Sequence, residues 1–153
     1  MALQTPCTLL VVDDDPGFLS ALATLLRRDG HAVDTAKSGE RALTQLQARR
    51  YDALLCDLQL SDLDGPTLYD IVRRQYPFLL PRVIFLTADV MRGDSLAFLE
   101  QCGQPWLAKP CPMAAVRRVL AQVLHVPVGA SVGGSHAHAR PRVTGHRERT
   151  TTP

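Results

Sequence analysis

The chain has 153 residues, of which 46% are hydrophobic and 21% are charged, and its formal net charge is +2. This length and composition are typical of one globular domain with its own core. Residues 125–153 carry four arginines against one glutamate, so residues 1–124 sum to −1. The positive balance therefore comes from the C-terminal segment and does not indicate a nucleic-acid-binding face.

The sequence shows no signal peptide and no apolar stretch long enough to span a membrane. Its four cysteines are scattered and lack the spacing of a metal site or a disulfide framework. Unpaired cysteines are typical of a reducing compartment. We therefore expect a cytoplasmic protein without a membrane segment.

Short apolar or alternating runs predict five strands, at residues 8–12, 31–36, 53–56, 83–86 and 106–108. Apolar residues at helical spacing predict five helices, at about residues 16–28, 39–50, 66–76, 92–102 and 113–124. Regular strand–helix alternation predicts a parallel sheet covered by helices on both faces.

The ends of the chain differ from this pattern. Residues 1–7 form a short extension before the first predicted strand. Residues 125–153 are rich in Gly, Pro, Ser, Thr, His and Arg and contain almost no large apolar residue. Such a composition cannot bury a core, so we expect this tail to be disordered.

Polar residues follow four of the predicted strands where each strand ends: Asp13, Asp14 and Asp15, then Asp57, Thr87 and Lys109. The carboxyl ends of parallel strands meet at one edge of a sheet, so these side chains are expected to converge. Crowded carboxylates require a compensating cation, and their oxygens suit magnesium. A hydroxyl and an ammonium suit the oxygens of a phosphoryl group.

Two details refine this prediction. Asp15 precedes Pro16, a pairing that is typical of a helix N-cap, so Asp15 is expected mainly to start the first helix. Lys109 is one of only two lysines among 17 basic residues. A compact ammonium suits contact with a single oxyanion better than a forked guanidinium does.

The chain resembles the receiver domains of bacterial two-component response regulators over about residues 8–124. The motifs that carry this resemblance are Val12-Asp13-Asp14-Asp15, Asp57, Asp64-Gly65, Thr87-Ala88 and Lys109-Pro110. The resemblance implies a single flavodoxin-like α/β domain, with five parallel strands in the order 2-1-3-4-5 and five flanking helices.

The resemblance also implies residue roles. Asp57 would accept a phosphoryl group from a phosphohistidine, and Mg²⁺ would be bound by Asp14, Asp57 and the backbone carbonyl of Gln59. Asp13 would hold a metal-bound water. The remaining roles are phosphoryl contact and switching for Thr87, Ala88, Lys109 and Trp106, a cis peptide bond at Pro110, and a structural role for Gly65.

Three positions depart from the family pattern. Ser61 stands where proline is frequent, Trp106 where tyrosine or phenylalanine is usual, and Cys111 where phenylalanine is common. None of these changes removes a chemical group from the predicted site.

The implied partners are a histidine kinase or a histidine phosphotransfer protein, and a downstream protein that the sequence does not identify. A phosphorylation-dependent dimer through the face formed by segments 92–102, 106–108 and 113–124 is a further contact that the resemblance implies. We expect no output domain on this chain and no direct DNA binding. The only catalysis expected is phosphorylation and dephosphorylation of the chain itself.

Three alternatives remain. The chain also resembles receivers fused to hybrid sensor kinases, so it could be a detached module of that type. Haloacid-dehalogenase-type phosphatases combine similar residues, but their signature from Asp13 needs Thr or Val where Gly17 stands. The third alternative is a pseudo-receiver that binds partners without phosphorylation.

Overall fold

The structure is a computed structural model, and it describes residues 5–88 and 93–125. Its strands are β1 (Thr8–Val12), β2 (Ala32–Ala36), β3 (Ala53–Asp57), β4 (Val83–Thr87) and β5 (Trp106–Ala108). Its α-helices are α1 (Pro16–Arg28), α2 (Gly39–Ala48), α3 (Gly65–Gln75), α4 (Gly93–Cys102) and α5 (Met113–Leu124).

The predicted elements are all present, with small differences at their ends. Helix α2 stops at Ala48, two residues before the predicted end, because Arg49 adopts an extended backbone. A 3₁₀ turn, η1 (Leu80–Arg82), precedes β4 and was not predicted. The predicted tail lies outside the described residues except for His125, as do residues 1–4 of the N-terminal extension.

The strands form one parallel sheet in the order β2-β1-β3-β4-β5, which confirms the predicted order. Val12 at the end of β1 is in register with Ala36 on one side and Cys56 on the other. On the far side of β3, Asp57 is in register with Leu86. The carboxyl ends of the central strands therefore lie along one edge of the sheet.

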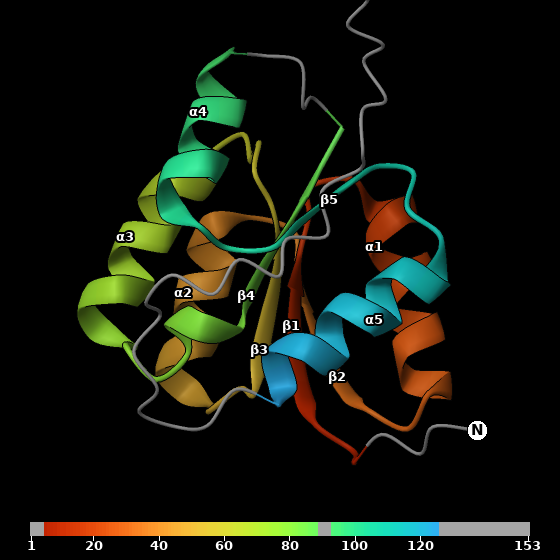
Figure 1. Ribbon diagram of the computed structural model, residues 1–153. Helices are drawn as coiled ribbons and strands as arrows, with labels where there is room; N and C mark the ends of the chain where they lie inside the picture. The colour runs from red at the N-terminus through yellow and green to blue at the C-terminus, as the bar shows by residue number, and fades with distance from the viewer. Residues whose placement is uncertain (1–4, 89–92, 126–153) are drawn as a thin grey trace, which may run out of the picture.

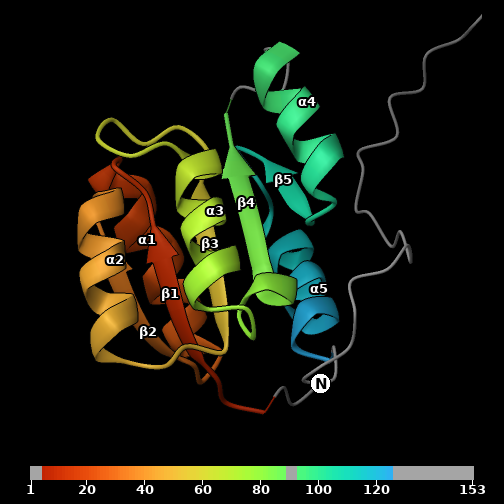
Figure 2. The ribbon, with the colours of Figure 1, turned by 90° about the vertical axis from the view of Figure 1, so that its left-hand side faces the viewer.

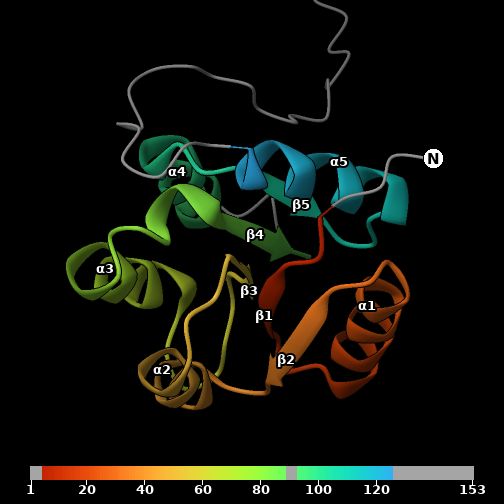
Figure 3. The same cartoon turned by 90° about the horizontal axis from the view of Figure 1, so that it is seen from below.

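The helices cover the two faces unequally. Helices α1 and α5 lie on one face, and α2, α3 and α4 lie on the other (Figures 1 and 3). Strand residues alternate between the two cores: Leu9 and Val11 pack toward α1 and α5, whereas Leu10 and Val12 pack toward α2 and α3. Figure 2 shows the second face from the side of α2, α3 and α4. A sheet buried on both faces explains the nearly continuous apolar runs in the sequence.

Within residues 5–88 and 93–125, no helix is long and apolar enough to cross a membrane. All four cysteines are free thiols, and Cys56 is fully buried in β3.

Candidate functional site

The acidic run after β1 divides into two parts. The Asp15 carboxylate accepts hydrogen bonds from the backbone N–H groups of Gly17 and Phe18, at 3.0 and 3.3 Å, and so caps α1. Asp13 is buried, and Asp14 is exposed. The prediction that Asp15 mainly starts the first helix is confirmed.

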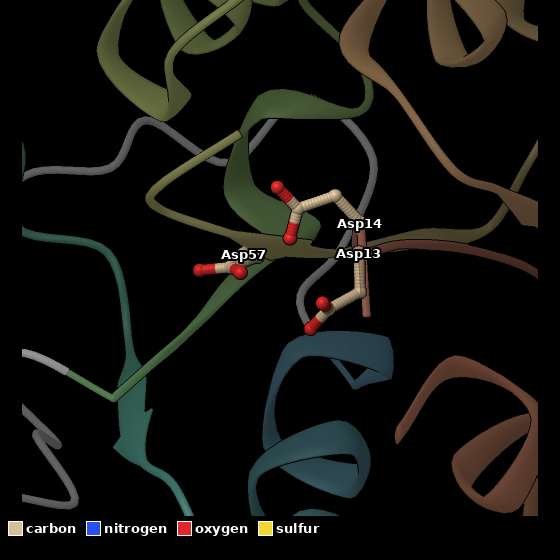
Figure 4. A group of neighbouring side chains, drawn as sticks. All are labelled: Asp13, Asp14 and Asp57. Atoms are coloured by element: carbon tan, nitrogen blue, oxygen red, sulfur yellow. The ribbon is translucent and has the colours of Figure 1, made fainter. Parts of the chain in front are cut away.

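Asp13, Asp14 and Asp57 form a cluster that could hold a metal ion. One carboxylate oxygen from each residue lies within 4.8 Å of the others. Figure 4 shows the three side chains gathered at the strand ends, with Asp13 and Asp14 following β1 and Asp57 ending the neighbouring strand β3. Carboxylate oxygens are the hard ligands that Mg²⁺ prefers.

Lys109 reaches this cluster from the residue that follows β5. Its Nζ donates to Asp13 Oδ2 in a short hydrogen bond and lies 3.2 Å from Asp57 Oδ2. The same Nζ lies 4.4 Å from the centre of the Phe18 ring, which gives a cation–π contact. Three carboxylates and one ammonium leave two negative charges uncompensated, which a divalent cation would neutralise.

Burial and neighbouring charges shift the pKa values of Asp57 and Lys109. Burial raises the pKa of Asp57, opposed by the hydrogen bond from the Gln59 backbone and by the Lys109 charge. Burial alone would lower the pKa of Lys109, but its bonds to Asp13 and the negative charges of both carboxylates raise it. Lys109 is therefore charged at neutral pH, and the Asp57 carboxylate carries an electrostatic cost.

The other predicted residues lie on neighbouring elements. Thr87 is fully buried at the end of β4, and its carbonyl accepts from the Lys109 backbone N–H at 2.8 Å. Ala88 is exposed. Trp106 is half-buried against the α2–α3–α4 core, on β5 and opposite Phe85. The structure therefore places Trp106 beside the core and two strand positions back from Ala108.

The bond before Pro110 is cis, as predicted. The structure also explains why position 65 is a glycine. A Cβ atom there would lie 2.8 Å from Leu58 Cα, and the Gly65 N–H donates to the Leu58 carbonyl at 2.9 Å. This close approach closes the β3–α3 loop (residues 58–64). In that loop Gln59 is exposed, and its N–H donates to Asp57 Oδ1 at 3.0 Å.

A hollow of about 390 Å³ opens beside the cluster, between the β3–α3 loop and the start of α4. Its lining includes Asp14, Gln59, Ser61, Asp94 and Ser95. Asp14 thus borders both the acidic cluster and this hollow.

Two residues that contribute to this region were not singled out from the sequence. Phe18 looked only like an apolar residue on the inner face of α1. Asp62 looked like one more polar loop residue, yet its carboxylate bonds to the start of α2. Their roles depend on contacts between elements, which one-dimensional spacing does not specify.

A doubly wound parallel sheet with acids, a hydroxyl residue and a lysine at its carboxyl edge belongs to the class of open α/β domains whose sites lie at the carboxyl ends of the strands. Comparison with known families narrows this class. The response regulator receiver domain model matches residues 9–121. The chain therefore belongs to the response regulator receiver domain family.

Relatives and solved structures agree with this assignment. The chain is 34% identical over 119 residues to the transcriptional regulatory protein GlrR of Escherichia coli, covering 78% of this chain and 26% of that protein. It is 31% identical over 118 residues to hybrid signal transduction histidine kinase L of Dictyostelium discoideum, covering 73% of this chain and 7% of that protein. The chain thus spans about a quarter or less of the length of these two relatives.

Among solved structures, the receiver domain of sensor histidine kinase PA1611 from Pseudomonas aeruginosa matches with a TM-score of 0.71 and 30% identity, covering 80% of this chain and 100% of that one. Its structure has a magnesium ion coordinated in the active-site cleft. The chemotaxis response regulator CheY4 of Vibrio cholerae matches with a TM-score of 0.69 and 26% identity, covering 78% of this chain and 99% of that one.

Proposed function

We propose that Asp57 accepts a phosphoryl group from a phosphohistidine on a histidine kinase or a histidine phosphotransfer protein. The observation that carries this proposal is the position of Asp57, a buried carboxylate that meets both the acidic cluster and Lys109. In the transfer, an Asp57 oxygen bonds to phosphorus, the phosphorus–nitrogen bond breaks, and the imidazole leaves with the electron pair.

Asp13, Asp14, Asp57 and the Gln59 carbonyl would hold Mg²⁺, with Asp13 acting through a bound water. The ion would supply charge neutralisation for the phosphoryl oxygens. Lys109 would pair with one phosphoryl oxygen, and Thr87 and Ala88 would contact the others. Phosphoryl transfer depends mainly on such positioning and electrostatic stabilisation.

The phosphorylated chain would signal through protein contacts, with the face of α4, β5 and α5 as the dimer surface and Trp106 as the switch residue. Leu96 on α4 is 37% exposed, which makes it one of the two most exposed large apolar side chains in the described part of the chain. The absence of DNA binding and the cytoplasmic location stay predictions.

A second candidate shares the same proposed chemistry but differs in the kind of protein from which the receiver domain derives. Matches to a hybrid histidine kinase and to the receiver of a sensor kinase favour a receiver detached from a hybrid kinase as the second candidate. Both candidates share the chemistry proposed for Asp57. They differ in the donor, which phosphotransfer from purified kinases and phosphotransfer proteins of the same cell would identify.

The decisive variant is Asp57→Asn, exposed to a phosphorylated histidine donor with Mg²⁺. We expect the unmodified chain to take up the phosphoryl group and the variant to take up none. A phosphatase that uses Asp13 would instead retain turnover in the variant. Asp13 is the more deeply buried of the two carboxylates, at 1% exposed against 7% for Asp57, which supports Asp57 as the acceptor.

A pseudo-receiver predicts no response to beryllofluoride. Trp106 is the only tryptophan in the chain. We expect its fluorescence to change when Mg²⁺ and beryllofluoride are added together. An unchanged spectrum in the unmodified chain would favour the pseudo-receiver.

A further inference from the structure

The β3–α3 loop is attached to the start of α2 by one side chain. Asp62 Oδ1 accepts from the Gly39 N–H and Asp62 Oδ2 from the Glu40 N–H, each at 3.0 Å. Ser38 Oγ accepts from the Arg41 N–H at 3.1 Å. The first turn of a helix leaves its N–H groups without helical partners, so Asp62 and Ser38 together satisfy three of them.

The charge of Asp62 suits this position. A carboxylate is stabilised at a helix N-terminus, where the N–H groups and the helix dipole are positive. The bonds from Glu40 and Gly39 lower the pKa of Asp62. The carboxylate is therefore ionised at neutral pH and bonds to both N–H groups.

Packing reinforces the attachment. A Cβ atom on Gly39 would lie only 2.5 Å from Leu63 Cβ, so the residue after Asp62 rests directly on the start of α2. Only glycine at position 39 lets the loop approach this closely.

The other end of the same loop touches the proposed phosphoacceptor. The Leu58 N–H donates to the Leu86 carbonyl at 3.3 Å, and the Gln59 N–H donates to Asp57 Oδ1 at 3.0 Å. Leu58 and Leu60 are buried. A single residue, Ser61, separates buried Leu60 from Asp62. The Gln59 backbone is thus held on one side by buried Leu58 and on the other by the bonds of Asp62 to α2.

We propose that Asp62 is a positioning residue, which holds the β3–α3 loop against α2 and so keeps the Gln59 backbone in the arrangement that binds Mg²⁺. Ser61 leaves the loop without the rigid ring of a proline, and the bonds of Asp62 to α2 constrain the loop instead. Helix α2 supplies none of the proposed ligands, yet it contributes to metal affinity through this bond. The inference rests on the proposed function.

The test compares two variants of the full chain that each remove one negative charge from the same loop. Asp62→Ala removes both bonds to α2. Asp64→Asn is the control: the Asp64 Oδ1 accepts from the Thr67 N–H at 2.8 Å and caps α3, and asparagine is an equally good cap. The probe is Mg²⁺ alone, titrated by calorimetry and by the amide shift of Gln59.

We expect Asp62→Ala to weaken Mg²⁺ binding about five-fold, because a smaller fraction of the loop is in the binding arrangement. The control should shift the affinity by less than about two-fold, through charge alone. At saturating Mg²⁺ the rate of Asp57 phosphorylation by acetyl phosphate should return to within about two-fold of the unmodified chain. If Asp62 mattered only for stability, its replacement would not lower the Mg²⁺ affinity while leaving the phosphorylation rate at saturating Mg²⁺ nearly unchanged.

Gly39→Ala disrupts the contact between the loop and α2 from the α2 side, because the new Cβ must displace Leu63. We expect it to weaken Mg²⁺ binding as well, and the double variant with Asp62→Ala to be little weaker than either single one. If Asp62→Ala fails to fold, Asp62→Asn takes its place in both comparisons, with a smaller expected loss of about two- to three-fold because it keeps one acceptor oxygen.

Equal Mg²⁺ affinities for the Asp62 variant and the Asp64→Asn control would overturn the inference, as would additive effects of the Asp62 and Gly39 changes. Failure of the unmodified chain to bind Mg²⁺ or to be phosphorylated would instead overturn the proposed function, and the inference with it.

Discussion

Asp57 combines a buried position with a charge that its surroundings only partly compensate. It is 7% exposed, it lies near two other carboxylates, and its nearest cation, Lys109, also bonds to Asp13. Functional sites commonly retain such unfavourable arrangements because the chemistry needs them. At the scale of single residues, the reactivity proposed for Asp57 therefore conflicts with the stability of the fold.

This conflict predicts that Asp57→Asn stabilises the metal-free protein. The raised pKa means that the folded state binds this proton more readily than the unfolded state, so the unmodified chain loses stability as the pH rises above about 3.8. At neutral pH the variant should gain about 1 kcal/mol in the free energy of unfolding, measured by urea titration with a chelator present. A less stable variant would show that the charge of Asp57 is well compensated without metal.

His31 is a second buried titratable residue, far from the site in sequence. It is 4% exposed, its Nδ1 accepts from the Cys7 N–H at 3.1 Å, and its Nε2 has no hydrogen-bond partner among the described residues. Burial lowers the pKa of His31, although the charge of Asp29 opposes this. The neutral ring is therefore the form that fits the fold.

The sign of the pH dependence follows. The unfolded chain takes up this proton near pH 6.5, whereas the folded chain takes it up only at lower pH. Stability should thus fall by up to about 1 kcal/mol between pH 7 and pH 5.5. His31→Gln keeps an acceptor for the Cys7 N–H and does not titrate, so its stability should stay flatter over this interval. Parallel curves for both proteins would contradict this assignment.

At the scale of elements, the β3–α3 loop is closed by a tight backbone contact between Gly65 and Leu58. Gly65→Ala would place a Cβ 2.8 Å from Leu58 Cα, and the backbone of Leu58 cannot move aside as a flexible side chain could. We expect a loss of about 2 kcal/mol in the free energy of unfolding.

Gly17→Ala is the matched control for this prediction. Its Cβ would meet nothing closer than Asp15 Oδ1 at 3.4 Å, and Gly17 lies in α1, where alanine is favoured over glycine. Chemical denaturation should show a neutral or slightly stabilised protein for Gly17→Ala. Equal losses for the two variants would mean that the loop is not closed by the contact at Gly65.

At the scale of the whole molecule, the sequence predicted the parts of the structure that depend on local pattern. The five strands, the five helices, the Asp15 cap and the convergence of Asp13, Asp14, Asp57 and Lys109 follow from periodicity and from parallel topology. The strand order came from family resemblance, because periodicity carries no information on which strands are neighbours.

Contacts between distant elements could not be predicted. The bond of Asp62 to α2, the fit of Gly39 against Leu63 and the Phe18 ring beneath Lys109 each join segments whose relative position only the folded chain defines. Polar loop residues such as Asp62 look alike in sequence whether they bond to a helix or to water. The contacts that support the site could therefore be identified only in the structure, whereas the residues proposed to react could be identified from the sequence.

The whole fold is proposed to present Asp57 as the phosphoacceptor. The most direct test of this proposal is mass spectrometry of the full chain after incubation with acetyl phosphate. We predict the addition of one phosphoryl group that requires Mg²⁺, maps to the peptide containing Asp57, is released by hydroxylamine and is absent from Asp57→Asn. Uptake that persists in Asp57→Asn, or maps to Asp13 or Asp14, would contradict the claim.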